Sequence, residues 1–327
     1  MPTSIWNENP IEYLLFKKIY SMIVSLIYPL AFYCVLTKSK KVSHILKILL
    51  ILHLFCITFQ WLVNAWLADP FYFYPMKITR YDGLLSNYFP ATTLYILMYT
   101  SFFFSIGSCL LIYFNRLFII QHIYYPRPSK FQKQYEKYVY LFVCFYSIIP
   151  NAFIIPQVPN QSLAKSNAVK IFNYLPDCIN DSNVVVACDA STNCMTRTSY
   201  NYIIWLSSIA FIMTSSTVYS SIRLSRGVKT KSTATRIRHK RFHRNTFLQA
   251  FIQMFFATVP NTIANLSVIF QIATPGLVYF IDFVSENHST SGVVTLFLFY
   301  EPYKEYIISL FKKTTKPKVI VIIIRDK

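Results

Sequence analysis

Long apolar segments alternate with short polar and basic segments along most of the chain. Each apolar segment is long enough to cross a hydrocarbon core of about 30 Å as a helix. Only helices and closed barrels satisfy their backbone groups in lipid, and the segments lack the alternation that barrel strands require. We therefore predict an all-α membrane protein, a seven-transmembrane helix bundle with spans at about 19–36, 46–67, 91–119, 138–156, 201–222, 246–270 and 277–300.

The third span leads directly into a basic segment. It runs without a charged residue from Ala91 to Phe114 and then meets Asn115 and Arg116, followed by a loop with two prolines. An arginine at the end of such a helix can extend its charge to the lipid headgroups. It can also act as a switch contact at the inner face of the bundle. The residues alone leave both interpretations open.

The sixth and seventh spans carry polar or helix-breaking residues. Pro260 lies inside the sixth span, where it predicts either a static kink or a hinge. The seventh span holds two acids, an asparagine and a histidine between residues 282 and 288, which are costly at membrane depth unless they face a cavity or a partner. A later start near Gly292 leaves too few apolar residues, so we predict the full-length span.

The distribution of Lys and Arg predicts the orientation. One side of the predicted spans holds 25 of the 32 basic residues: four in 37–47, five in 116–137, nine in 222–244 and seven after residue 303. Basic residues are retained on the cytoplasmic side. We predict an N-terminus outside and a C-terminus inside, in one domain over residues 1–327, although Lys17 and Lys18 precede the first span.

Composition excludes several classes of function. The chain is 54% hydrophobic and 14% charged, whereas soluble domains carry about 25% charged residues. The net charge of +19 is divided among segments between apolar spans, so it indicates contact with membrane lipids and no nucleic acid. No hydrolase, zinc or nucleotide-binding motif is found, and the six histidines are scattered. We therefore expect no enzyme, no metal and no cofactor.

The predicted outer loop 157–199 contains glycosylation and disulfide candidates. Its sequons begin at Asn160 and Asn180, and this topology places them where glycosylation occurs. Three cysteines share the same loop, in an oxidising location. We expect Cys178 to pair with Cys188 or Cys194, because either pairing closes a reasonable loop and leaves one thiol spare.

The predicted inner loop 222–244 has nine basic residues and no acid. Attraction to anionic lipid explains such a segment, and docking of a cytoplasmic partner is the second interpretation. The candidates for partner contact are Arg223, Arg226, Arg238 and Arg244.

The segment after the last span predicts a short amphipathic helix on the inner leaflet, at about 302–313. Ile307, Leu310 and Phe311 fall at helical spacing and lysines flank them, a pattern typical of interfacial helices.

Polar residues in the outer halves of two spans are candidates for ligand binding. The pair in the third span and the pair in the seventh span each lie one turn apart, and they are Tyr95, Tyr99, Asp282 and Glu286. The two acids could pair a cationic ligand, or they could pair with Arg80 or Lys77 from an outer loop.

These features together resemble a G-protein-coupled receptor. The sequence departs from the rhodopsin-like class, because Asn115-Arg116-Leu117 stands where that class has an acid-Arg-aromatic triplet. The last span ends in Glu-Pro-Tyr-Lys (301–304) in place of Asn-Pro-x-x-Tyr. With Ile-Tyr-Pro-Leu-Ala-Phe-Tyr at 27–33 and Tyr-Pro at 125–126, the chain resembles nematode serpentine chemoreceptors of the Srg superfamily, in the Srv or Srg class.

The resemblance implies a chemosensory receptor in the plasma membrane, a multi-pass protein of sensory neurons. Such a receptor binds a small-molecule odorant or pheromone-like ligand and activates a heterotrimeric G protein. By position, Asn115 and Arg116 match the family's switch. The alternative is a seven-span ligand-gated channel or a transporter. Channels such as insect odorant receptors place the amino end inside, against the charge distribution, and no inverted repeat indicates a transporter.

Overall fold

The seven predicted apolar segments all lie in helices, which satisfy their backbone hydrogen bonds internally. The computed structural model describes residues 6–39, 43–124, 129–227 and 233–311. The corresponding elements are α1 (Ile11–Ser25) with α2 (Ile27–Thr37), α3 (His44–Leu62) with the π-helical turn η1 (Val63–Leu67), α4 (Ala91–Tyr124), α5 (Lys130–Ile154) with the 3₁₀ turn η2 (Ile155–Gln157), α7 (Cys194–Gly227), α8 (Thr233–Ile269) and α9 (Pro275–Phe299).

Five helical segments are long and apolar enough to cross a membrane, judged by length and composition. Within the described residues these segments are Ile11–Thr37, His44–Leu67, Ala91–His122, Cys194–Ile222 and His239–Ile269. The helices of the fourth and seventh predicted spans, α5 and α9, are 25 residues long each and are not among these five segments. The seventh helix is continuous, as the full-length span predicts.

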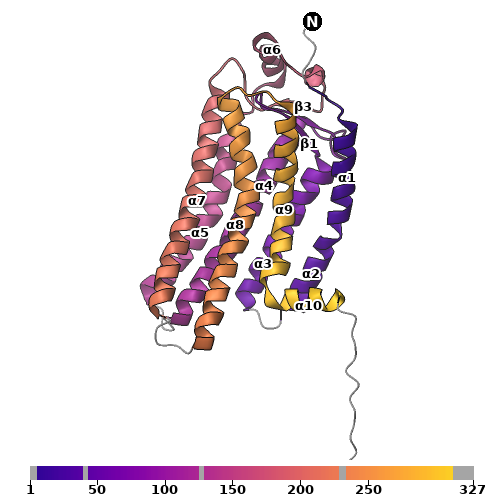
Figure 1. Ribbon diagram of the computed structural model, residues 1–327. Helices are drawn as coiled ribbons and strands as arrows, with labels where there is room; N and C mark the ends of the chain where they lie inside the picture. Colours follow the sequence, from indigo (N-terminus) through magenta and orange to yellow (C-terminus); the bar gives the residue numbers. More distant parts are fainter. Residues whose placement is uncertain (1–5, 40–42, 125–128, 228–232, 312–327) are drawn as a thin grey trace, which may run out of the picture.

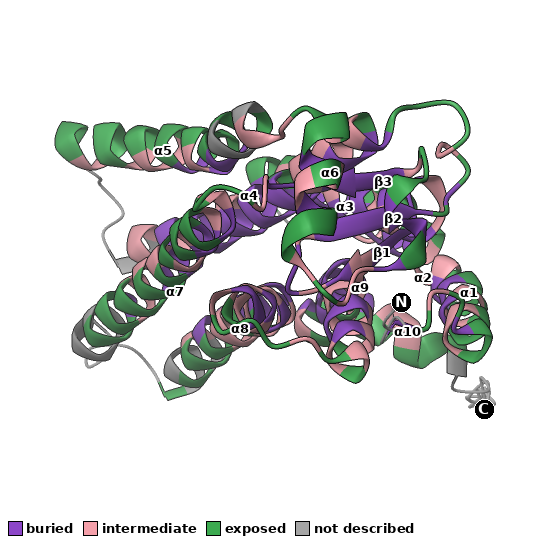
Figure 2. Cartoon of the chain, turned by 90° about the horizontal axis from the view of Figure 1, so that it is seen from above, coloured by how far each residue is buried: buried purple, intermediate pink, exposed green. Residues whose placement is uncertain are grey.

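Helix α4 lies at the centre of the bundle. Of its most apolar window 83% is buried, against 22–39% for the other four candidate spans. It packs against α3, α5, α7 and α8. The outward faces of α1, α5 and α7 are largely exposed (Figure 2) and carry large apolar side chains such as Phe145, Ile204 and Phe211. Such faces are suited to lipid, as expected for a multi-pass membrane protein.

The first helix begins earlier than its predicted span at residue 19. It starts at Ile11 and therefore includes Lys17 and Lys18. Pro29 has no N–H to donate to the carbonyl of Ser25, which is where α1 ends before α2 begins at Ile27. Pro29 thus divides this span into two helices.

A three-stranded antiparallel sheet covers one end of the bundle, and the all-α prediction is wrong in this respect. Strands β1 (Pro70–Phe73) and β2 (Ile78–Tyr81) form a hairpin, and β3 (Val184–Val186) pairs with β2. The aromatic and β-branched composition of these segments favours strands. Figure 1 shows β1 and β3 beside the short helix α6 (Gln161–Ile171) at the end where the chain begins. We call this the outer end, following the predicted orientation.

Both predicted sequons lie in this outer layer. The Asn160 side chain caps α6 by accepting a hydrogen bond from the Ser162 backbone N–H at 3.1 Å. Asn180 ends the 3₁₀ turn η3 (Asp177–Asn180). Both side chains are exposed, so either is accessible to a modifying enzyme.

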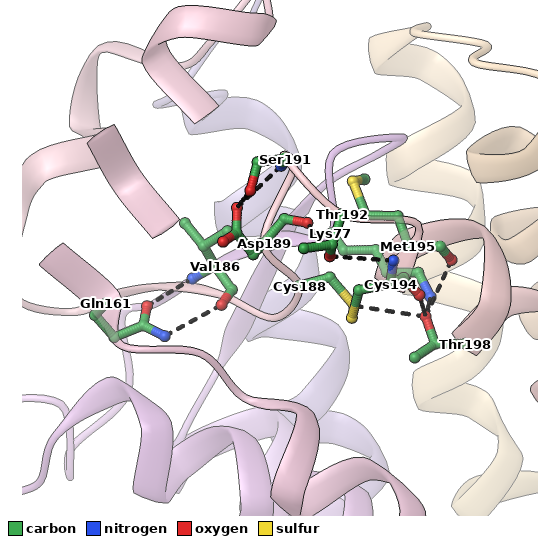
Figure 3. The surroundings of a disulfide bond; sticks show 10 residues. All are labelled: Lys77, Gln161, Val186, Cys188, Asp189, Ser191, Thr192, Cys194, Met195 and Thr198. Carbon is green, nitrogen blue, oxygen red and sulfur yellow. Dashed lines mark hydrogen bonds between the residues drawn. A yellow bond between two sulfur atoms is a disulfide. The ribbon is translucent and has the colours of Figure 1, made fainter. Parts of the chain in front are cut away.

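The disulfide joins Cys188 to Cys194, and the expected pairing of Cys178 is wrong. The two bonded residues lie six positions apart with their Cα atoms 5.6 Å apart, on either side of a tight turn (Figure 3). Cys178 is buried and free, because η3 places it against the apolar underside of the sheet with Phe73 and Val184. Burial raises the pKa of its thiol to about 12.

The predicted amphipathic helix is present at the opposite end, which we call the inner end. Helix α10 (Glu301–Phe311) runs crosswise beneath the bundle (Figure 1). Tyr303 is fully buried and shares a hydrogen bond with the Ser39 hydroxyl at 2.6 Å, which ties α10 to the end of α2. The last two residues of the predicted helix, 312 and 313, lie outside the described residues.

Candidate functional site

A small cavity of about 50 Å³ lies beneath the sheet, between the hairpin and α4, α7 and α8. We call it the outer cavity. Its walls are mainly aromatic and amide side chains, together with one lysine, and are formed by Tyr72, Tyr74, Lys77, Ile78, Thr79, Tyr95, Tyr99, Gln157, Ala187, Cys188, Thr198, Tyr202, Asn261 and Asn265. A second cavity of about 30 Å³ adjoins it and shares Tyr72, Tyr74, Tyr99, Tyr202 and Asn261.

Two predicted ligand-binding residues, Tyr95 and Tyr99, line the outer cavity. Their spacing of four places both rings on one face of α4, with centroids 4.7 Å apart. Tyr95 also packs in an apolar cluster with Leu94 and Val185 beneath the sheet. The pair therefore joins the floor of the cavity to the sheet that covers it.

Lys77 is the one basic residue among the walls of the outer cavity. Its ammonium donates a hydrogen bond to the Thr198 hydroxyl at 2.5 Å (Figure 3). The backbone φ of Lys77 is 51°, in the left-handed region that non-glycine residues rarely adopt and that often marks functional positions. Burial lowers the pKa of Lys77 to about 7, and among the described residues no carboxylate lies within ion-pair distance of it.

Asp282 and Glu286 lie elsewhere, in an ionic cluster around Lys17. The Lys17 ammonium contacts a carboxylate of each at 3.0 and 2.8 Å, and Asp69 at 3.2 Å. Lys18 adds a second contact to Asp69 at 2.6 Å. Lys17 is 2% exposed, and a lysine in an apolar helix is tolerated only where anionic partners compensate its lost hydration.

The ionic cluster corrects the prediction for the two acids of α9. Their partner is Lys17 of α1, and neither Arg80 nor Lys77 contacts them. Arg80 pairs with Asp82 at 2.8 Å and donates to the Glu8 carbonyl, while Lys77 faces Thr198. Asp282 and Glu286 are absent from the walls of the outer cavity, so their predicted role in binding a cationic ligand loses its geometric basis.

A larger groove of about 340 Å³ lies between α5 and α7 and adjoins the outer cavity. We call it the membrane groove. Its lining is mostly apolar and comprises Tyr146, Ile149, Pro150, Gln157, Thr198, Asn201, Tyr202, Ile204, Trp205 and Ser208. Gln157, Thr198 and Tyr202 belong to both the membrane groove and the outer cavity.

A buried polar network connects four helices at the middle of the bundle. The Gln253 amide of α8 donates to Nε2 of His53 at 2.8 Å, so His53 donates from Nδ1 to the Ser108 hydroxyl at 2.8 Å. His288 of α9 donates from Nδ1 to the Gln253 carbonyl at 2.9 Å, and its Nε2 accepts from Ser105 of α4 at 3.1 Å. Both imidazoles are satisfied in their neutral forms. Among the described residues, no group of three or more His, Cys, Asp or Glu side chains is arranged to hold a metal ion.

Arg116 lies at the inner end of the bundle and is 2% exposed, so it does not reach the headgroups. Its guanidinium carbon is 3.9 Å from the ring centroid of Tyr300 and 5.5 Å from that of Phe242. It donates to the Thr246 hydroxyl at 3.4 Å, and its Nε finds no hydrogen-bond partner among the described residues. The neighbouring Asn115 donates to the Tyr140 hydroxyl of α5 at 2.9 Å. The Tyr300 ring therefore stabilises the Arg116 guanidinium by a cation–π contact, in the place where an acid would form an ion pair.

An inner cavity of about 980 Å³ opens beside Arg116, between α3, α4, α8, α9 and α10. Its walls carry two arginines, two acids and several apolar side chains: Ser43, Leu46, Arg116, Ile119, Ile237, Arg241, Phe242, Asn245, Phe299, Tyr300, Glu301, Pro302 and Glu305. A helix is about 10–12 Å wide with its side chains, and a mixed apolar and charged groove at this end is suited to a partner segment.

The predicted basic contacts belong to the inner ends of α7 and α8. Arg244 is exposed on α8. Arg223, Arg226 and Arg238 lie in the helical ends of α7 and α8, but their side chains lie outside the described part of the chain. Sequence reasoning did not single out Arg241, which lines the cavity.

Helix α8 contacts both cavities, and Pro260 lies between the two contacts. Asn261 and Asn265 line the outer cavity, while Phe242 and Thr246 touch Arg116 at the other end. Pro260 is buried inside the helix. The Asn261 amide donates to the Ala257 carbonyl at 2.8 Å, next to the Phe256 carbonyl that Pro260 leaves without its helical donor.

Several residues that build these sites were missed at the level of sequence. Tyr300 precedes the Glu-Pro-Tyr-Lys motif and carries no pattern that links it to Arg116. Lys17 follows an apolar run, Tyr13-Leu-Leu-Phe16, which indicates that the helix starts before it. The hairpin is indicated by the aromatic run 71–74 and the β-branched pair Ile78-Thr79. A predicted hairpin would have placed Lys77 in its turn, close to the bundle.

A helical bundle with lipid-facing outer surfaces, a covered outer cavity, and a buried arginine beside an inner cavity is the architecture of a seven-transmembrane receptor. The chain belongs to the serpentine type 7TM GPCR chemoreceptor family Srh, whose family model matches residues 8–313. It is thus a member of a chemoreceptor family and not of an enzyme family.

The family differs from the class that the motifs suggested. Srh is a distinct family from the Srv and Srg classes, so the resemblance was right about serpentine chemoreceptors and wrong about the class. The diagnostic motifs were short, and Asn-Arg-Leu or Glu-Pro-Tyr-Lys alone do not separate related families. No curated protein matches the chain.

Proposed function

We propose that this chain is a chemosensory receptor that binds a small odorant or pheromone-like molecule in the outer cavity and activates a heterotrimeric G protein at the inner cavity. It acts as one domain in the plasma membrane of a sensory neuron, with seven spans, the N-terminus outside and the C-terminus inside. Membership of the Srh family supports the receptor over the channel or transporter alternative.

The observation that carries this proposal is the position of Arg116. An arginine that is 2% exposed, stacked on Tyr300 and bordering a cavity of about 980 Å³ can change partners when the inner end opens. No carboxylate contacts Arg116 within the described residues, so its release requires only the loss of the aromatic contacts and of the hydrogen bond to Thr246. The neighbouring acids Glu301 and Glu305 lie in the same wall.

Helix α8 supplies the coupling between the two ends. A ligand that contacts Asn261 changes the free energy of the outer half of α8, and Pro260 permits the two halves to tilt relative to each other. The inner half holds Thr246 and Phe242 against Arg116. A ligand shifts the population towards the open inner end only by its difference in affinity for the two states.

Basic side chains around the inner cavity supply the second part of the G-protein contact. Arg241 lines the cavity and Arg244 is exposed beside it. We propose that Arg223, Arg226 and Arg238 extend this basic surface. It suits an acidic partner and speeds its association at low ionic strength.

The test is guanine-nucleotide exchange in membranes that contain the full-length chain and a panel of Gα subunits, with short- and medium-chain alcohols, aldehydes, acids and amines as ligands. Arg116→Ala should abolish ligand-dependent exchange while the protein still reaches the surface. Arg197→Ala is the matched control, because Arg197 is an exposed arginine at the outer end. No exchange with any Gα from a surface-expressed protein would overturn the proposal and make current recording the next step.

A further inference from the structure

The outer cavity and the membrane groove are adjacent and differ in chemistry. Gln157, Thr198 and Tyr202 line both parts. The outer cavity contains Lys77 and the two amides Asn261 and Asn265, whereas the membrane groove is bounded mainly by apolar and aromatic side chains. A molecule that fills both parts must therefore have a polar head and an apolar body.

The charge of the head follows from Lys77. Its ammonium faces the Thr198 hydroxyl at 2.5 Å, at the boundary between the two parts. The walls of both parts contain no Asp or Glu. A half-buried lysine without an acidic neighbour favours an anionic head and repels a cationic one.

Unpaired polar atoms in the same walls support this assignment. The Tyr202 hydroxyl, the indole N–H of Trp205 and Oε1 of Gln157 are buried and find no hydrogen-bond partner in the described part of the chain. Tyr202 is 9% exposed. Buried polar groups are normally satisfied, and the Tyr202 hydroxyl, which lines both parts, is a donor that a carboxylate would accept from.

Size restricts the head to a small group. The outer cavity has a volume of about 50 Å³. One water molecule needs about 10–15 Å³ of such cavity volume. A carboxylate fits this space, and a phosphodiester headgroup does not. The membrane groove, at about 340 Å³, falls in the range of small-molecule sites and has room for a hydrocarbon chain.

The apolar part of the site opens towards lipid. Ile149 and Ile204 line the membrane groove and are 43% and 65% exposed on the outer surface of α5 and α7. The sheet covers the outer cavity from the opposite side, so the groove is the open route.

We propose that the outer cavity and the membrane groove together bind a medium-chain monocarboxylic acid, which enters from the bilayer between α5 and α7, places its carboxylate at Lys77 and lays its chain along Trp205. This inference rests on the proposed ligand role of the outer cavity. It names the chemical class of the ligand and its route.

The test measures binding of tritiated decanoate to the full-length chain in phosphatidylcholine nanodiscs, with empty nanodiscs subtracted. We expect saturable binding that unlabelled decanoate displaces and that decanol and decylamine do not. Each added methylene from hexanoate to decanoate should strengthen binding about fourfold, which corresponds to about 0.8 kcal/mol per buried methylene. Equal competition by decanol, or no saturable binding, would overturn the proposal in favour of a groove that holds only bilayer chains.

Two pairs of variants localise the head and the chain. Lys77→Met should weaken decanoate binding by about ten- to a hundredfold. Its control is Lys170→Met, because Lys170 is an exposed lysine in the outer layer. Ile149→Trp should block the membrane groove, whereas Ile148→Trp changes a neighbour that is also lipid-facing, at 49% exposure, and does not line the groove. Both isoleucines lie on the surface, so these variants keep the test valid should Lys77→Met fail to fold.

Binding and nucleotide exchange separate this inference from the proposed function. Decanoate binding that requires Lys77 but produces no exchange would support the site and contradict G-protein coupling. Exchange driven by other ligands, without decanoate binding, would retain the receptor and overturn the carboxylic-acid assignment.

Discussion

A lysine inside an apolar helix needs anionic partners, because the loss of hydration costs several kcal/mol. Lys17 has three such partners: Asp69, between η1 and β1, and Asp282 and Glu286 of α9. These ion pairs fix the position of α1 against the rest of the bundle. The side chain of the adjacent Lys18 is 34% exposed, so its ammonium keeps part of its hydration. Adjacent lysines therefore have different roles.

Lys17→Met should destabilise the protein by about 3–5 kcal/mol, since it leaves Asp282 and Glu286 buried without their cation. Thermal unfolding of the purified protein and its surface expression measure the effect. Lys18→Met is the control and should cost less, because its partner Asp69 keeps Lys17. Equal losses in the two variants would contradict a central role for Lys17.

The affinity for decanoate should depend on pH through Lys77. Its pKa is lowered to about 7, so the ammonium is charged below pH 7 and becomes neutral as the pH rises. Above that point, binding an anion requires uptake of a proton, and affinity should fall by about tenfold per pH unit. The tyrosines that face Lys77 in the outer cavity are Tyr72, Tyr74, Tyr95, Tyr99 and Tyr202. The reference pKa of a tyrosine is about 10 and burial disfavours its charged form, so these side chains stay neutral in this range.

Nanodisc binding between about pH 6 and pH 9 measures this dependence. Lys77→Arg should bind with a flat profile, because a guanidinium keeps its charge throughout the range. A wild-type profile as flat as that of the arginine variant would show that the charge of Lys77 does not govern binding.

At the scale of elements, close approach of α4 and α5 depends on Gly107. A Cβ at this position would lie 2.0 Å from the Ser147 hydroxyl oxygen and 2.7 Å from the Ser147 Cβ. The hydroxyl can rotate away, but the Cβ cannot move without its backbone. The two helices would have to separate, although the central α4 is constrained by α3, α7 and α8 as well.

Gly107→Ala should therefore destabilise the bundle by about 1–3 kcal/mol, the usual cost of overpacking. Thermal unfolding of the full-length protein checks it. Gly276→Ala is the matched control, because no atom lies within 4 Å of a Cβ built there, and it should be neutral or slightly stabilising. Similar unfolding temperatures for the two variants would show that α4 and α5 can separate freely.

The outer layer shows how far element types follow from sequence. The spans were found because each helix satisfies its backbone locally, and a continuous apolar run is sufficient to specify it. The sheet was missed because β3 joins β2 from more than 100 residues further along the chain, and three valines in a row carry little local signal. The disulfide was missed for a related reason: the sheet encloses Cys178 and leaves Cys188 and Cys194 on one turn.

At the scale of the whole molecule, the orientation in the membrane is the main prediction from charge. The sheet, α6 and both sequons lie at one end, and α10 lies at the other (Figure 1). Since glycosylation occurs only on the outer side, the sequons report which end faces out.

Asn160→Gln and Asn180→Gln should each remove one glycan, and the double variant should lose all shift on treatment with an N-glycosidase. An amino-terminal epitope should be accessible on unpermeabilised cells. Unglycosylated wild-type protein with an epitope accessible only after permeabilisation would contradict the N-out orientation and favour an inverted, channel-like topology.

The membrane class, the seven helical segments, the inner amphipathic helix and the chemoreceptor relationship could all be predicted from the sequence. These depend on local hydropathy and on short motifs, which a linear reading contains. The sequence also identified Arg116, Tyr95, Tyr99 and Pro260 as positions of interest, because a charge, paired rings or a proline within an apolar run is unusual in itself.

Which side chains contact each other could be learned only from the three-dimensional fold. Lys17 and Asp282 are 265 positions apart, and Lys77 reaches Thr198 across 121. Ionic and hydrogen-bonded partners are selected by packing of whole helices and a sheet, where desolvation makes every unpaired group costly. For that reason Asp282 and Glu286 of α9 form ion pairs that stabilise the fold. Lys77, which has a left-handed backbone conformation between β1 and β2, is the cation of the outer cavity.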